Sequence, residues 1–112
     1  MTVKTSITSL IKEKKTKKIS IGFPKAPRTT LTVIIDVGFE NQLYIRGTGA
    51  GLKWDQGILL KNRGPNQWIW ESDKAFDSCY FKVLINDQNF EIGKDHYIEC
   101  GEKRSYSPVF TS

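Results

Sequence analysis

"CYFKVLIND", residues 79–87, is the stretch that most directly indicates the fold, because apolar side chains recur at every second position. One face of this stretch carries Cys79, Phe81, Val83 and Ile85, and the other carries Tyr80, Lys82 and Leu84. Alternation with a period of two is typical of a β-strand that buries one face. The stretch therefore predicts a strand whose Cys79 face packs on a core.

Similar short segments occur on both sides of this strand, with turn residues between them. They are residues 30–37, 41–47, 58–66, 67–72, 90–93, 96–100 and 107–111. Seven or eight short strands with turns about every 8–12 residues, and no long helix, are typical of an antiparallel β-sandwich or a small barrel. The sequence therefore predicts an all-β domain.

The net charge of +5 over 112 residues is concentrated near the N-terminus. Residues 1–28 carry eight Lys and Arg and one Glu, a net charge of +7, whereas residues 29–112 carry nine basic and eleven acidic residues, a net charge of −2. We expect a basic N-terminal extension, residues 1–28, and one domain, residues 29–112. Within the extension, residues 7–11 fit a short amphipathic helix and residues 19–23 fit a strand.

The sequence also indicates the cellular compartment of the protein. No apolar stretch approaches the ~20 residues that cross a bilayer, so we expect no membrane partner. Because no apolar block fits a signal peptide, we expect a cytoplasmic protein. Free thiols at Cys79 and Cys100 are the expectation for that compartment.

The glycine-rich stretch "YIRGTGAGLKWDQG", residues 44–57, raises the question of a phosphate-binding loop. Its spacing fits neither G-x-G-x-x-G, because Leu52 stands at the third glycine, nor the P-loop pattern. Strand-like residues follow, so no helix N-terminus is available for an anion. We expect the glycines to give slack to a loop that holds Trp54 outward.

Catalytic and metal-binding patterns are not evident in the sequence. His96 is the only histidine, and Cys79 lies on the apolar face of its strand, where it is expected to be a small core residue. No Cys, His and carboxylate cluster has metal-ligand spacing, and a solvated turn accounts for Asp87, Glu91 and Asp95. We expect a protein that is not an enzyme and needs no cofactor.

The aromatic residues are the remaining indication of function. Trp54 stands in a polar loop where packing does not require it, whereas Trp68 is expected in the core. Lys82 is expected on the exposed face of its strand, and Phe90 follows the polar turn "NDQN". Aromatic rings stack on the C–H faces of sugars, and nearby lysine, amide and acid groups bond the hydroxyls, so this set favours a carbohydrate ligand.

The order of motifs from about residue 30 onward resembles that of the starch- and glycogen-binding carbohydrate-binding modules. The matching motifs are "LYIRG", "GLKWD", "GILL", "NQWIWE", "FKV" and "NDQNFEIGKDH". The resemblance implies an immunoglobulin-like antiparallel β-sandwich that binds a polysaccharide, an α-glucan. It places Trp54 as the first stacking ring and Lys82 as the lysine of the binding site. Phe90 stands where the family has a second tryptophan, and Glu91 and Asp95 lie near its polar sugar-contacting positions.

Two other functions remain open. The sandwich could serve as a protein-interaction or regulatory domain that has lost sugar binding, with residues 1–28 as the arm that contacts a protein partner. The lysines of that arm could also bind nucleic acid. The net negative charge of residues 29–112 makes nucleic acid the least favoured ligand.

Overall fold

A computed structural model describes residues 27–111, which form an all-β domain with nine strands and no helix in that range. The strands are β1 (Thr29–Ile34), β2 (Leu43–Thr48), β3 (Ile58–Leu59), β4 (Lys61–Asn62), β5 (Gln67–Ser72), β6 (Cys79–Ile85), β7 (Asn89–Phe90), β8 (His96–Ile98) and β9 (Lys103–Tyr106). The helix and strand expected within residues 1–26 lie outside the described residues. In the described part of the chain, no helix has the length and hydropathy to span a membrane.

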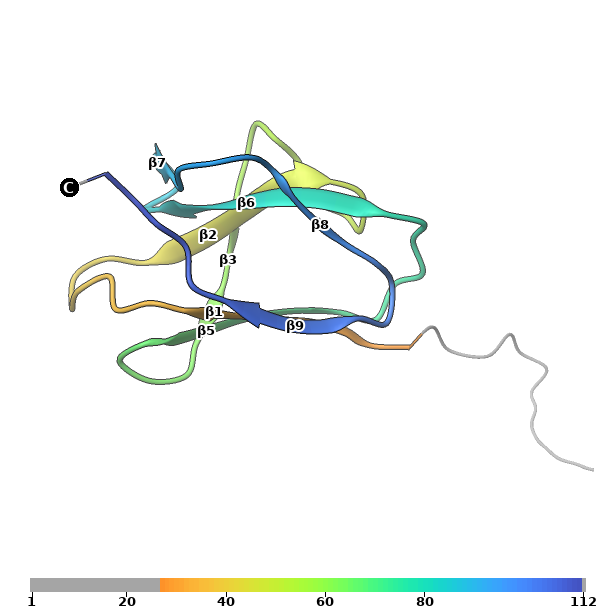
Figure 1. Ribbon diagram of the computed structural model, residues 1–112, viewed down its shortest axis with the longest axis horizontal. Coiled ribbons are helices and arrows are strands. Elements are labelled where there is room, and N and C mark those ends of the chain that lie inside the picture. Colours follow the sequence, from red (N-terminus) through yellow and green to blue (C-terminus); the bar gives the residue numbers. More distant parts are fainter. Residues whose placement is uncertain (1–26, 112) are drawn as a thin grey trace, which may run out of the picture.

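The strands form two facing sheets, which confirms the predicted β-sandwich (Figure 1). One sheet has the order β4-β5-β1-β9, and the other begins β3-β2-β6. Both β7 and β8 pair with β6, β8 near the start of that strand and β7 near its end. The edge of β6 that faces away from β2 is therefore occupied by two short strands in succession.

The core lies between the sheets and follows the predicted alternation in β6 as far as Val83; Leu84, predicted on the outer face, is also fully buried, and Ile85 is partly buried. In β6, Cys79, Phe81 and Val83 are fully buried, whereas Tyr80 is 48% exposed. The buried hydrophobic cluster also contains Leu31, Val33, Leu43, Ile45, Leu52, Leu60, Trp68, Trp70 and Ile98. Burial of Trp68 confirms its assignment to the core and leaves Trp54 as the exposed tryptophan of the described residues.

The segment predicted as one strand, residues 58–66, crosses from one sheet to the other. β3 pairs with β2, whereas β4, two residues later, pairs with β5 in the opposite sheet. Between them, Leu60 is 2% exposed, and its N–H donates to the carbonyl oxygen of Leu43 at 2.9 Å. The apolar Leu60 side chain enters the core at the crossing, so one predicted strand becomes two and the described chain has nine strands.

The last strand lies earlier than predicted and runs parallel to its neighbour. β9 pairs with β1 in parallel, an exception in an otherwise antiparallel sandwich. The predicted strand at residues 107–111 is wrong, because β9 ends at Tyr106 and Pro108 follows. A proline has no N–H for a ladder hydrogen bond, and here Pro108 is buried instead.

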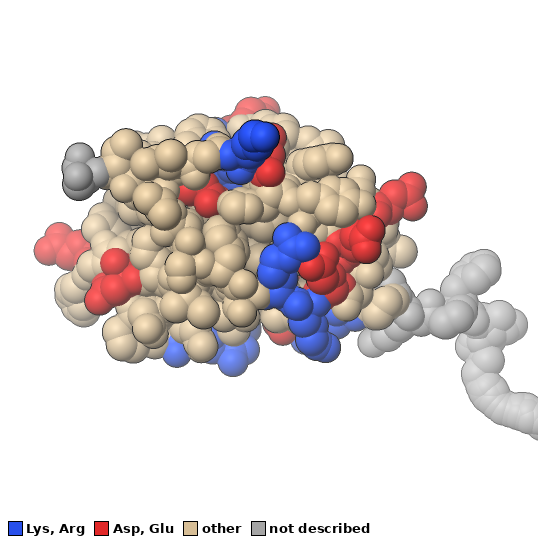
Figure 2. Space-filling view, viewed as in Figure 1, with Lys and Arg blue, Asp and Glu red and all other residues tan. Residues whose placement is uncertain are grey.

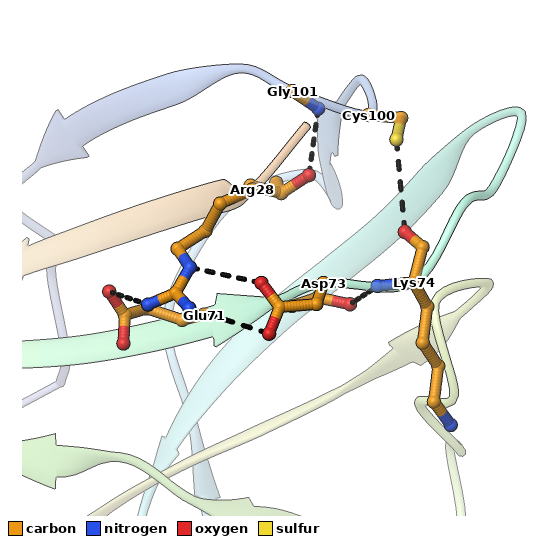
Figure 3. Close-up of polar contacts among 8 residues, drawn as sticks. Arg28, Glu71, Asp73, Lys74, Cys100 and Gly101 are labelled. Carbon is orange, nitrogen blue, oxygen red and sulfur yellow. Dashed lines mark hydrogen bonds and ion pairs between the residues drawn. The ribbon is translucent and has the colours of Figure 1, made fainter. Parts of the chain in front are cut away.

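Polar contacts fix the point where the described chain enters the sandwich (Figure 3). The Arg28 guanidinium donates from Nε to Asp73 at 3.0 Å and lies 3.6 Å from a carboxylate oxygen of Glu71. The hydroxyl of Thr29 accepts the N–H of Gly101 at 2.8 Å. The start of β1 is thus joined to the end of β5 and to the turn before β9.

Candidate functional site

Trp54 lies in the segment between β2 and β3, whose course depends on two glycines packed against β6. A Cβ atom on Gly47 would collide with the carbonyl oxygen of Tyr80, and one on Gly49 with that of Ser78. Gly49 also has a φ of 96°, which other residues rarely adopt. The glycines were expected to give the loop slack, but they allow close contact between backbones.

Trp54 is exposed, as predicted, and hydrogen bonds hold it in place. The indole Nε1 donates to the hydroxyl of Thr48 at 2.6 Å, and the Trp54 carbonyl oxygen accepts from Arg46 Nη1 at 3.0 Å. The N–H of Gly47 donates to the carbonyl oxygen of Lys53, so this segment runs along the side of β2 away from β6. The indole is therefore oriented at the margin of the β2–β6 sheet, with Trp54 37% exposed.

Arg46 forms an ion pair with Asp87, which lies in the turn between β6 and β7. Arg46 Nε donates to Asp87 Oδ1 at 2.9 Å, and Nη2 donates to the Asp87 carbonyl oxygen at 3.0 Å. The hydrogen bond raises the pKa of the Arg46 guanidinium and lowers the pKa of the Asp87 carboxyl group. Asp87 Oδ2 also accepts the N–H of Gly57 at 3.3 Å, so one carboxylate joins the segment that follows Trp54 to the β6–β7 turn.

Phe90 lies on the same surface as Arg46. It belongs to β7, is 43% exposed, and pairs with Leu84 of β6. The Arg46 guanidinium carbon lies 5.6 Å from the centre of the Phe90 ring, within the range of a cation–π contact. Since Arg46 also bonds the carbonyl oxygen of Trp54, one guanidinium connects the two predicted stacking residues.

Lys82 also lies on this face, directly across from Arg46. The two residues pair in register between β2 and β6, which places two cations on one face, an arrangement that destabilises a sheet. Asp87 neutralises Arg46, and Lys82 Nζ donates to the carbonyl oxygen of Glu91 at 3.1 Å. The face keeps a half-buried ammonium group between strands that carry exposed aromatic rings.

Glu91 lies inside the sandwich, away from the exposed face. It is 2% exposed, and one carboxylate oxygen accepts from the Val83 N–H at 2.7 Å and the Tyr106 hydroxyl at 2.8 Å. The other oxygen lies 2.8 Å from His96 Nε2. Three strands therefore converge on one carboxyl group, which gives Glu91 a structural role and leaves it no oxygen free for a surface ligand.

Asp95 is exposed directly before β8. The pairing of β8 with β6 ends at His96 and Phe81, one residue after Asp95 in the chain. Of the two predicted acidic contacts, Asp95 is thus exposed at the start of β8, whereas Glu91 is buried inside the sandwich.

The thiols, the metal-ligating side chains and the surface charges complete the description of the predicted groups. Cys79 and Cys100 are free thiols, as predicted, and burial raises the pKa of the Cys79 thiol to about 11. No cluster of three metal-ligating side chains occurs among the described residues. On the face shown in Figure 2, acidic and basic side chains intermingle rather than forming a field of one sign.

The chain matches no family model and no curated protein. Among solved structures it is similar to the glycoside hydrolase family 15 glucoamylase from Hypocrea jecorina, with a TM-score of 0.56 and 16% identity. The match covers 87% of this chain and 20% of that chain, so it spans about a fifth of the glucoamylase's length. At this identity the similarity shows a shared β-sandwich fold.

Sequence reasoning missed three residues that organise the face. Arg46, Thr48 and Asp87 hold the rings, but they are not aromatic and match no motif. The alternation in β2 could have identified the first two, because it places Arg46 and Thr48 on the face opposite Leu43 and Ile45. For Asp87, the sequence gives no indication, because its partner lies 41 residues away.

Proposed function

We propose that residues 29–112 act as a non-catalytic carbohydrate-binding module for an α-glucan such as glycogen or starch. The observation that carries this proposal is the exposure of Trp54 and Phe90 on one face, both in contact with Arg46. A sugar chain needs separate apolar platforms at fixed positions. Arg46 bonds the main chain of Trp54 and lies over the Phe90 ring, and Thr48 accepts the indole N–H.

The chemistry of the face suits a neutral sugar. Pyranose rings present C–H groups to the Trp54 and Phe90 rings, while hydroxyl groups need donors and acceptors around them. Lys82 supplies N–H donors, and Asp95 supplies a carboxylate acceptor. Each aromatic contact contributes roughly 0.5–1.5 kcal/mol beyond the area buried, so a few of them give dissociation constants on the order of micromolar to millimolar.

The fold similarity to a glucoamylase, a glycoside hydrolase, also supports a carbohydrate ligand. Because unrelated functions share the β-sandwich, the proposal rests on the exposed rings rather than on the fold.

Affinity electrophoresis in gels that contain glycogen or amylopectin tests the proposal. We expect both polysaccharides to retard the wild-type protein, and Trp54→Ala to abolish the retardation. The matched control is Ile34→Ala, which removes a 38% exposed apolar side chain from β1 of the opposite sheet. This control should migrate as the wild type does.

Thermal unfolding must accompany the gels, because a binding loss counts only for a folded variant. Trp54→Ala should stay folded, since its ring lies outside the core cluster. Wild-type protein that migrates equally in gels with and without polysaccharide would overturn the proposal.

A further inference from the structure

Two tyrosines on the same sheet have no part in the function proposed above. Tyr80 of β6 and Tyr97 of β8 pair in register, and their ring centres are 5.2 Å apart with planes tilted by 59°. They are 48% and 38% exposed. The core does not require these rings, because their strand neighbours Phe81 and Ile98 provide the buried side chains.

The pairing of β6 with β2 connects this tyrosine pair to Trp54. Tyr80 also pairs with Thr48 of β2, and partners directly opposite in antiparallel strands project to the same face. The Thr48 hydroxyl accepts the indole N–H of Trp54 at 2.6 Å. A continuous row therefore crosses the sheet from Trp54 through Thr48 and Tyr80 to Tyr97.

The dimensions of the row suit several linked sugars. Neighbouring strands are ~4.8 Å apart, so β2 to β8 spans ~10 Å, with the Trp54 indole beyond one end. A pyranose ring has a width similar to one strand spacing. Stacking platforms at both ends, with the Thr48 hydroxyl between them, can hold successive units of one chain.

Polar groups lie beside the tyrosine end. The Tyr97 hydroxyl donates to Glu99 at 3.3 Å, and the Tyr97 carbonyl oxygen accepts from Arg104 at 2.6 Å. Loss of contact with solvent, and to a lesser degree the charge of Glu99, raises the pKa of the Tyr97 phenol. Hydroxyl and carboxylate groups thus lie beside the exposed rings, as a sugar ligand requires.

We propose that Tyr80 and Tyr97 form a further sugar-binding subsite, which continues the Trp54 platform and accommodates a longer linear α-glucan. The inference rests on the proposed function and adds ligand length to it. Short oligosaccharides occupy the Trp54 and Phe90 region, and longer ones also contact the tyrosine pair.

Single-stranded nucleic acid also stacks on aromatic rings of a sheet, so charge is needed to choose between the ligands. Asp87 neutralises Arg46 on this face, Glu102 pairs with Arg104 beside Tyr97, and Lys82 bonds a carbonyl oxygen. Glu99 also lies beside Tyr97. A phosphate backbone needs a continuous basic track, whereas the tyrosine end carries a carboxylate. The charges therefore favour a neutral glycan.

Isothermal titration calorimetry with maltotriose and with maltoheptaose tests the subsite. We expect the wild-type protein to bind maltoheptaose more tightly than maltotriose. Tyr80→Ala and Tyr97→Ala should each lower the maltoheptaose affinity about 3- to 10-fold, since each removes a stacking ring. Both variants should keep the wild-type affinity for maltotriose, which also shows that they are folded.

Tyr97→Phe is the matched control, because it keeps the ring and removes the hydroxyl. It should retain most of the maltoheptaose affinity. Equal maltoheptaose affinities for wild type and both alanine variants would overturn the subsite while leaving the Trp54 site intact. Tighter binding of single-stranded RNA than of maltoheptaose, lost in the same variants, would also overturn it. No binding of either oligosaccharide by the wild-type protein would instead defeat the proposed function itself.

Discussion

Arg46 and Asp87 lie 41 residues apart in the chain, yet they form two hydrogen bonds, one to the Asp87 carboxylate and one to its carbonyl oxygen. From this pair the guanidinium reaches the carbonyl oxygen of Trp54 and the ring of Phe90. The ion pair is therefore the element on which both proposed stacking platforms depend, although neither of its members is aromatic.

The Arg46–Asp87 pair makes a prediction about acid stability. The folded-state pKa of Asp87 is lowered, so the pair stabilises the fold above the unfolded Asp value of about 3.9, and this stabilisation is lost as the pH falls through the folded value. Asp87→Asn should therefore unfold at a lower temperature than the wild type above about pH 5, and the gap should narrow below about pH 4.

Melting curves across that range provide the measurement. Glu102 also has a lowered pKa, because its carboxylate accepts the Glu99 N–H, but it is present in both proteins. The difference between the two melting profiles therefore isolates Asp87. A gap that stays constant down to pH 2 would contradict the assignment.

Thr48→Val tests whether the orientation of the indole matters for binding. The substitution keeps a β-branched residue in β2 but removes the acceptor that holds Trp54 Nε1. Glucan affinity should fall about 2- to 10-fold, the range that corresponds to one hydrogen bond, as measured by tryptophan fluorescence. Thr32→Val, on the outer face of the opposite sheet, is the control, and an equal effect of both variants would rule out a specific role for Thr48.

Glu91→Gln separates a structural role from a binding role. The carboxylate is buried and joins Val83, Tyr106 and His96, so the variant should lose about 1–3 kcal/mol of unfolding free energy in urea. Because both carboxylate oxygens of Glu91 bond groups inside the sandwich, the folded variant should bind glycogen as the wild type does. A selective loss of glycogen binding at unchanged stability would return Glu91 to the site.

The two thiols should differ in reactivity. Cys79 is fully buried and its thiol pKa is raised to about 11, whereas Cys100 is half-buried. At neutral pH, a thiol-specific reagent should modify Cys100 in the native protein and should reach Cys79 only in denaturant. Modification of both residues at the same rate in native protein would show that the core opens readily around β6.

A variant that lacks residues 1–26 tests the basic extension. The proposed stacking residues lie within the described sandwich, so this variant should keep its affinity for glycogen. Pro27 and Arg28 are retained because Arg28 bonds Asp73 and Pro27 lies against Gly101. If the extension serves as an arm for a protein partner, pull-down of that partner should fail with the variant. A parallel loss of glycogen affinity would assign part of the sugar site to residues 1–26.

The long strands could be predicted from sequence because each exposes one face and buries the other. Alternation in β1, β2 and β6 reflects a core on one side, so local pattern and tertiary structure agree. Trp54 was expected at the surface because it stands in a polar loop, and Phe90 because it follows the polar turn at residues 86–89. These features depend on residues that are neighbours in the chain, and a local sequence pattern contains information about such neighbours.

The remaining features depend on distant partners. The strand change at Leu60 follows from pairing with β2 on one side and with β5, in the opposite sheet, on the other. The position of β9 follows from pairing with β1, at the other end of the described chain. Glu91 was expected in a solvated turn, near the sugar-contacting positions that the family resemblance implies. Bonds from Val83, Tyr106 and His96 instead compensate for burying its charge. No local pattern reports such partners.

The parallel pairing of β1 with β9 has a mechanical consequence. A load applied through the chain on both sides of the sandwich pulls β1 from its start and β9 from its end, in opposite directions along the strands. The hydrogen bonds between them are then loaded together in shear instead of opening one after another. A domain joined in this way resists extension along its own chain, which suits a protein anchored to a polymer.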